Sequence, residues 1–261
     1  MESIAENTDL KNTVVSKSDV ASEPSPSTVP ERKNYNKTIV FAMMGEKFSY
    51  KFMQCWLETF SFCLENGIRP LMSFSGDTDP FVMRNSLIGG SMNGGIEQKP
   101  FGGKLEYDYI MWIDGETLFS HKHVEQLIEG MEKYDVVSGA CLDTGMKNYN
   151  AIVNTDIDVL KESGKFDNVP KEKLEELAET ENPYLKVDYV DLGFVMVKRG
   201  VMERFEYPWF QQKACNLVKD NMVYAENYSA QHSFCLDLKK KGYDVMIDSR
   251  VLVKREYNVV F

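Results

Sequence analysis

The sequence predicts an α/β fold, a single domain whose mixed, mainly parallel sheet is flanked by helices. Short apolar runs alternate with helical patterns through the first 140 residues, which is typical of parallel strands joined by helical crossovers. One such run, residues 109–113, delivers two acidic side chains, Asp114 and Glu116, at its carboxyl end. A hydrophobic content of 43% in 261 residues is enough to form a large core.

The elements of the first half follow from local patterns. Residues 38–43 form an apolar run that ends at Met44 and Gly45, and the apolar stripe of residues 50–64 has helical spacing. A second strand is expected at 69–73, and Asp79 or Thr78 would cap a helix through 81–85. The glycine-rich run 89–95 indicates a flexible loop on the substrate side.

The second half is predicted to extend the same sheet. Its expected elements are a helix at 123–134, strands at 135–140 and 187–198, a helix at 230–241 and a strand at 245–253.

Composition divides the chain into a tail and a domain. Residues 1–34 are rich in Ser, Thr, Glu, Asn and Pro, a composition that predicts a disordered tail. We expect one domain over 35–261, with a first half at 35–140 and a second half at 141–261. A polar insertion at about 154–182 belongs to the second half.

Charge and cysteine content exclude several classes of protein. The net charge of -10 and the pI near 5.0 argue against a general nucleic-acid binder, because phosphate binding needs a basic face. No run approaches the roughly 18 apolar residues of a membrane span. The five cysteines are scattered without metal-site spacing, so we expect a reducing compartment and a cytoplasmic protein.

Motifs narrow the chemistry further. The chain has no Gly-x-Gly-x-x-Gly after the first strand, no Gly-Lys-Ser/Thr phosphate loop and no Gly-x-Ser-x-Gly elbow. Ligands of open α/β sheets bind beyond the carboxyl ends of the strands, where Asp114 and Glu116 are expected. Two such acids can share a hard divalent cation that in turn holds a diphosphate. The alternative is a solvated acidic turn.

Several spaced motifs give the chain a resemblance to a known family. Residues 37–261 resemble the nucleotide-sugar glycosyltransferases of the GT-A fold, and look most like compact members from large algal viruses and marine phages. If the chain is viral, the host cytoplasm is its expected location. The motifs are Arg84-Asn85, Gly89-Gly90, Gln98-Lys99-Pro100-Phe101, residues 107–119, Gly193-Phe194, Tyr207-Pro208-Trp209-Phe210 and Phe234-Cys235 before Lys241-Gly242-Tyr243.

The resemblance implies a nucleotide-binding half at 35–140 and an acceptor half at 141–261, with the donor site at the ends of the first strands. Asp114 and Glu116 would occupy the D-x-D positions that hold Mn²⁺ or Mg²⁺ against the diphosphate of a nucleotide sugar. The forked charge of Arg84 suits a phosphate contact, with a surface ion pair as the alternative. The other residues implied in nucleotide binding are Met44, Gly45, Asp77 and Asn85.

Three positions depart from the family pattern. The second acid is Glu116 instead of Asp, and Ala230-Gln231 stands where the family carries Glu-Asp with the general base. Lys254-Arg255 stands where a histidine often ligates the metal, and arginine cannot ligate a cation. One interpretation is that the protein keeps the fold and binds a nucleotide or glycan but transfers little sugar. The other is that Lys254 and Arg255 neutralise the diphosphate directly.

If transfer is retained, the base must come from elsewhere. Asp191, just before Gly193, is the first candidate and Asp188 the second, with Glu226 or His232 in reserve. Ion-paired surface acids are the alternative for both aspartates.

The leading hypothesis is a glycosyltransferase moving a sugar from a nucleotide diphosphate donor to a glycan, glycoprotein or other hydroxyl acceptor. A catalytically inactive protein of the same fold that binds sugar nucleotides or glycans is the alternative.

Overall fold

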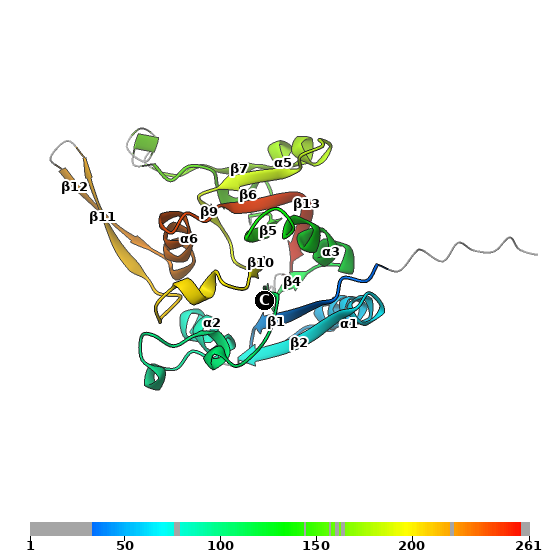
Figure 1. Cartoon of the computed structure of the whole chain (residues 1–261). Helices are drawn as coiled ribbons and strands as arrows, with labels where there is room; N and C mark the ends of the chain where they lie inside the picture. Colours follow the sequence, from blue (N-terminus) through cyan, green and yellow to red (C-terminus); the bar gives the residue numbers. More distant parts are fainter. Residues whose placement is uncertain are drawn as a thin grey trace, which may run out of the picture. The chain divides into compact units, whose positions relative to one another are not determined.

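A mixed eight-stranded sheet forms the centre of the described part of the chain (Figure 1). The computed structural model describes residues 33–75, 79–143, 145–156, 158–159, 162, 165–219 and 222–256. The strand order is β2-β1-β3-β10-β5-β13-β4, and β8 also pairs with β13. The strands are β1 (Lys37–Met44), β2 (Ile68–Ser75), β3 (Tyr109–Asp114), β4 (Thr117–Leu118), β5 (Val136–Cys141), β8 (Tyr184–Val187), β10 (Phe194–Lys198) and β13 (Val245–Arg255).

The strand directions confirm the predicted α/β fold with a mixed sheet. β1 is parallel to both β2 and β3, and β13 is parallel to β5. β10 runs antiparallel between β3 and β5. Because β1 and β3 are parallel and in register, their carboxyl ends meet at Met44 and Asp114.

Helices cover both faces of the sheet. They are α1 (Tyr50–Glu65), α2 (Pro80–Leu87), α3 (His121–Gly130), α5 (Lys171–Ala178) and α6 (Ala230–Lys240). Within the described ranges, no helix combines the length and apolar character that crossing a membrane requires.

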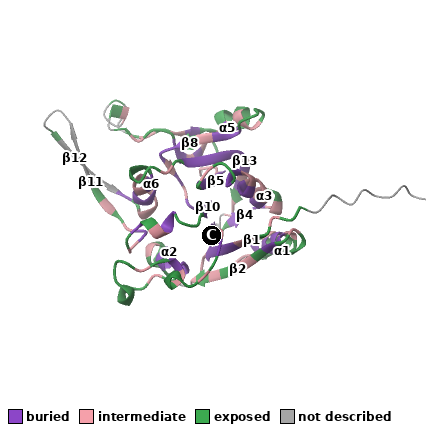
Figure 2. Cartoon of the chain, in the orientation of Figure 1, coloured by how far each residue is buried: buried purple, intermediate pink, exposed green. Residues whose placement is uncertain are grey.

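Alternation along β1 builds a core on each face. Phe41 packs with residues of α1 and α3, whereas Ala42, its neighbour, packs with residues of α2 and α6. Buried residues are concentrated on the central strands in Figure 2. Full burial of each large apolar side chain contributes about 1.5–3 kcal/mol, so the two cores stabilise the sheet from both sides.

Two smaller sheets lie beside the central one. β6 (Asn148–Ile152) pairs with β7 (Asn168–Pro170) and β9 (Tyr189–Val190), and β11 (Lys213–Lys219) forms a hairpin with β12 (Met222–Tyr228).

The strand predicted at 187–198 is interrupted, which corrects the sequence-based expectation. The run breaks at Asp188, between β8 and β9, and again after Val190, where pairing with β6 ends. The Asp191 N–H still donates to the Asn150 carbonyl of β6, at 3.0 Å. The Gly193 carbonyl then accepts from the Asp114 N–H at 2.9 Å before β10 begins. The break places Asp191 beside the end of β3.

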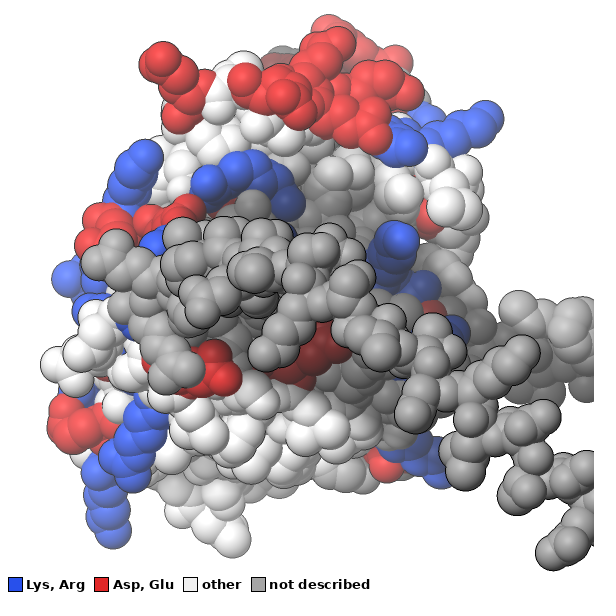
Figure 3. Space-filling view, turned by 90° about the vertical axis from the view of Figure 1, so that its right-hand side faces the viewer, with Lys and Arg blue, Asp and Glu red and all other residues white. Residues whose placement is uncertain are grey.

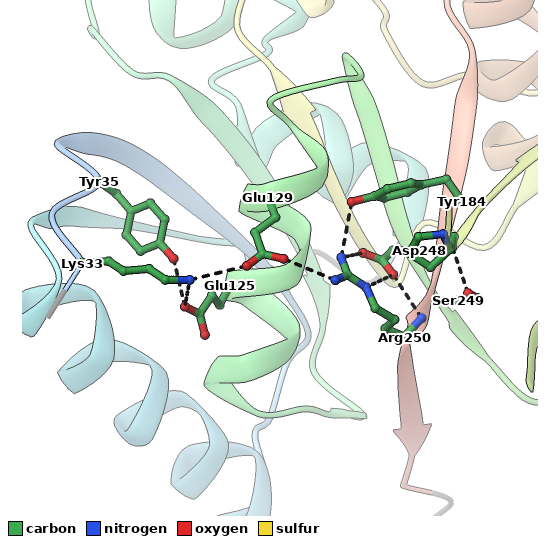
Figure 4. A network of polar contacts seen from close by, with 9 residues as sticks. Lys33, Tyr35, Glu125, Glu129, Tyr184, Asp248, Ser249 and Arg250 are labelled. Atoms are coloured by element: carbon green, nitrogen blue, oxygen red, sulfur yellow. Dashed lines mark hydrogen bonds and ion pairs between the residues drawn. The ribbon is translucent and has the colours of Figure 1, made fainter. Parts of the chain in front are cut away.

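A polar network fastens the start of the described chain to the sheet (Figure 4). Lys33 Nζ and the Tyr35 hydroxyl each donate to Glu125 Oε1 of α3, both at 2.9 Å. Glu129, one turn later, accepts from Arg250 of β13 at 3.3 Å. Arg250 in turn holds the fully buried Asp248, with Nη2 2.7 Å from Oδ2.

Candidate functional site

A pocket of about 620 Å³ opens at the carboxyl ends of β1 and β3. The β3–β4 turn closes onto β1, since the Gly115 N–H donates to the Met44 carbonyl at 2.7 Å. A Cβ at Gly115 would lie 3.0 Å from that carbonyl oxygen, so the close approach favours glycine. Four residues predicted for the donor site share this lining: Met44, Gly45, Asp114 and Glu116.

Asp114 binds two guanidinium groups at the inner wall of this pocket. Arg84 Nη2 donates to Asp114 Oδ1 at 3.1 Å, and Arg255 Nη2 donates to Oδ2 at 3.3 Å. Arg84 projects from α2 and is 1% exposed. The ion pair is therefore buried, and the alternative of a surface ion pair for Arg84 does not apply.

Asp191 completes the cluster of charges. Its Oδ2 accepts from Arg255 Nη2 at 2.8 Å. With its amide oriented to satisfy both neighbours, Gln231 donates to Asp191 Oδ1 at 3.2 Å and accepts from Arg84 Nη2 at 3.1 Å. We call Arg84, Asp114, Asp191, Gln231 and Arg255 the ion network. Its two aspartates and two arginines balance in charge.

Glycine at position 193 makes room for this network. A Cβ on Gly193 would lie 2.9 Å from Asp114 Oδ2 and 3.1 Å from Arg255 Nη2. The close approach at this glycine is to side chains of the protein itself.

Burial and neighbouring charges act on the pKa values of two members of the network. Burial disfavours the charged form of Arg255, but Asp191 and Asp114 outweigh burial and hold its pKa above the ordinary arginine value. Burial raises the pKa of Asp114 above its ordinary value, and the Arg84 guanidinium opposes that rise without reversing it.

The donor set around Asp114 does not fit a divalent cation in the way the resemblance implies. Both Asp114 oxygens accept from arginines, which cannot ligate a cation. Glu116 is exposed in the turn. Among the described residues, no group of three or more His, Cys, Asp or Glu side chains is placed to hold a metal ion. The metal role of Asp114 and Glu116 stays a prediction without geometric support.

Other predicted residues lie apart from the network. Asp188 accepts from Lys239 Nζ at 2.8 Å and from the Thr155 N–H at 2.9 Å. Burial alone would raise the pKa of Asp188, but these hydrogen bonds outweigh it and lower the pKa. Lys254 is exposed on β13.

Asn85 ties two segments together. Its Nδ2 donates to the Phe81 and Phe210 carbonyls, both at 2.9 Å, and its Oδ1 accepts from the Phe210 N–H. His232 packs against the rings of Tyr189 and Tyr228. Asp77 and the Glu226 side chain lie outside the described part of the structure.

A second pocket, of about 400 Å³, lies on the other side of the ion network. Arg84 and Gln231 line it, whereas Asp114 lines the first pocket. Tyr189, Gln212 and Ser229 also line it and were not predicted as site residues. Nothing in their local sequence indicates a site, because β9 and α6 are brought together only by the fold.

No protein-family model and no curated protein matches the sequence. Similar solved structures include A197 from STIV, which is 14% identical with a TM-score of 0.46, over 86% of this chain and 96% of that one. GalNAc-T7, solved with UDP, GalNAc and Mn²⁺, is 8% identical with a TM-score of 0.46 over 85% of this chain. This chain spans 44% of the GalNAc-T7 chain. The inositol-1-phosphate CTP transferase from T. maritima is 11% identical with a TM-score of 0.38, over 86% and 90% of the two chains. At these identities the likeness concerns the backbone alone.

Proposed function

We propose that this chain binds a nucleoside diphosphate sugar at the carboxyl ends of β1 and β3. The pocket that brings Met44, Gly45, Asp114 and Glu116 together carries the proposal. Its volume of about 620 Å³ suits a small-molecule ligand, and open α/β sheets bind their ligands at this end.

A diphosphate in this pocket needs positive charge. The lining contains four acidic residues and one basic residue, Lys47. Figure 3 shows one face of the molecule, where acidic side chains gather at the top of the view and basic ones are dispersed. Of the two arginines in the ion network, Arg255 is the better placed to respond, because its side chain is 21% exposed and that of Arg84 only 2%. We infer that Arg255 forms charge-assisted hydrogen bonds with the diphosphate.

Binding has more geometric support than transfer. A general base must be free to take a proton from the acceptor hydroxyl. Asp191 is bonded to Arg255, and Asp188 is bonded to Lys239. Both candidate bases are therefore engaged before any ligand arrives.

Glycosyl transfer is the second candidate function, favoured by the position of the ion network. The network separates the donor pocket from the second pocket, where an acceptor hydroxyl would lie. If Arg255 turned to the leaving diphosphate, Asp191 would be released to accept the acceptor's proton. Donor binding and activation of the base would then be coupled through one side chain.

A thermal-shift screen of UDP, GDP, CDP and their sugars, each with Mn²⁺ and with a chelator, tests the binding proposal. We expect one nucleoside diphosphate to stabilise the protein in chelator, by about 2.7 kcal/mol at one hundred times its dissociation constant. Arg255→Ala should abolish the shift, and Arg69→Ala, an exposed arginine on β2, should not. A shift that needs Mn²⁺ and survives Arg255→Ala would assign the charge to a metal, and no shift at all would overturn the proposal.

Transfer is then tested with the sugar of the nucleotide identified. Asp191→Asn should abolish sugar release to an acceptor while the nucleotide shift persists. If the wild-type protein releases no sugar although it binds the nucleotide, binding is the whole function.

A further inference from the structure

An apolar pocket of about 430 Å³ lies between α2, the loop around the short helix at Met92–Gly94, and the Tyr207-Pro208 segment. Apolar groups of Phe81, Val82, Met92, Ile96, Tyr207 and Pro208 dominate its lining. Met92 is 91% exposed and Ile96 is 60% exposed. Large apolar side chains that gather around a hollow in this way mark a binding surface, whereas single exposed ones do not.

Hydrogen bonds hold the rim of this pocket in place. Gln98 Nε2 donates to the Ser91 and Gly95 carbonyls at 2.8 and 2.7 Å, and Gln98 Oε1 accepts from the Ser91 N–H at 3.0 Å. The Tyr207 N–H donates to the Ile96 carbonyl at 2.9 Å. The pocket is thus formed before a ligand binds, which lowers the ordering cost of binding.

The apolar pocket adjoins the second pocket across one side chain. Phe81 lines both of them. The second pocket offers the Gln212 amide, the Ser229 hydroxyl and the Tyr189 ring, which suit a polyhydroxylated ring. The charge of Arg84 at its inner end is already balanced by Asp114. The two pockets together match a ligand with a neutral polar head and an apolar tail.

We propose that the acceptor of this protein is a neutral glycolipid-like amphiphile, with its sugar head in the second pocket and its single apolar tail in the apolar pocket. The inference rests on the proposed function, because it names the acceptor class for the same site. The head lies against the ion network, across from the donor pocket, and the tail leads away past Phe81.

Calorimetric titration with hexyl, heptyl and octyl β-glucosides, kept below their micelle concentrations, tests the proposal. Each added methylene should tighten binding roughly fourfold, as expected for its burial. Glucose alone should bind at least tenfold more weakly than octyl glucoside. Affinity that does not change with tail length would overturn the proposal.

Matched variants distinguish binding in this pocket from unspecific binding to exposed apolar side chains. Ile96→Asp and Met92→Asp should each weaken octyl glucoside binding at least tenfold. Leu57→Asp, on α1 and 59% exposed, should not weaken it. An equal loss in Leu57→Asp would show unspecific binding and overturn the proposal.

The head is tested separately. Gln212→Ala should weaken octyl glucoside binding and leave octanol binding unchanged, and octyl sulfate should bind more weakly than octyl glucoside. Octyl sulfate binding as tightly would overturn the placement of a neutral head.

Nucleotide thermal shifts are read on the same wild-type preparation. Octyl glucoside binding without any nucleotide shift overturns the donor site and leaves the amphiphile pocket standing, although not as an acceptor site. A nucleotide shift without octyl glucoside binding overturns only the amphiphile pocket.

Discussion

One carboxylate, that of Asp114, accepts hydrogen bonds from two arginines, so we expect its removal to lower the stability of the fold. Asp114→Asn leaves the buried Arg84 without its ionic partner. We expect a loss of about 3 kcal/mol in the free energy of unfolding, as for other broken buried pairs. Urea denaturation at pH 7 measures it. Glu116→Gln, in the exposed turn, is the control and should change stability by less than about 0.5 kcal/mol. Small, equal losses in both variants would contradict the ion network.

The lowered pKa of Asp188 should make the stability of the protein depend on pH. Its folded pKa lies below the ordinary value, so its stabilising effect is present above the unfolded pKa of about 3.9 and disappears as pH falls through the folded value. Asp188→Asn should therefore cost about 1–2 kcal/mol between pH 5 and 8. The difference from the wild type should shrink below about pH 4. Denaturation curves across this pH range show whether the stability difference shrinks or grows as pH falls. A difference that grew towards acid pH would refute it.

At the level of elements, α2 is positioned by Asn85 as much as by its apolar face. Asn85→Ala removes the bonds to the Phe81 and Phe210 backbones and should cost about 1–3 kcal/mol. Asn85→Asp should cost more, because a carboxylate would face two carbonyl oxygens. Thermal unfolding of both variants shows which of them is less stable. Ser86→Ala, the exposed neighbour on α2, is the control.

The elements show which parts of the fold a local pattern can predict. The apolar runs of β1, β3 and β13 and the apolar stripe of α1 appear close to their expected bounds. The hairpin β11–β12 and the strands β6 and β7 were not predicted. The break at Asp191 depends on the Asn150 carbonyl of a distant strand, which no local pattern contains.

The sequence predicts only those parts of the candidate site that follow directly after a strand in the chain. Asp114 and Glu116 follow a buried strand, so their place at the sheet edge could be inferred. The pairing of Asp114 with Arg84 and Arg255 joins positions 30 and 141 residues apart, and only the folded chain brings them together. Gln231, interpreted from the sequence as a lost base, belongs to the same network.

At the scale of the whole molecule, the hydrogen bonds of Lys33 and Tyr35 to Glu125 indicate where the stable domain begins. A chain starting at residue 33 keeps both bonds to Glu125, and its Tm should equal that of the full chain. A chain starting at residue 37 loses these bonds and the Tyr35 N–H bond to the Asn66 carbonyl. Its Tm should fall by about 2–4 °C for each kcal/mol lost. Calorimetry of the three chains tests this boundary. A lower Tm for the chain starting at 33 would place stabilising contacts before Lys33.

β1 connects this anchored start to the donor pocket. Its eight residues make seven steps of about 3.3 Å, which separate Lys37 from Met44 by roughly 23 Å. Coupling a chain that starts at residue 33 to a sensor surface through its amino group would therefore hold the domain at the amino end of β1, away from the donor pocket. Immobilised protein prepared in this way should suit surface-based ligand measurements, since its attachment point is remote from the residues under study.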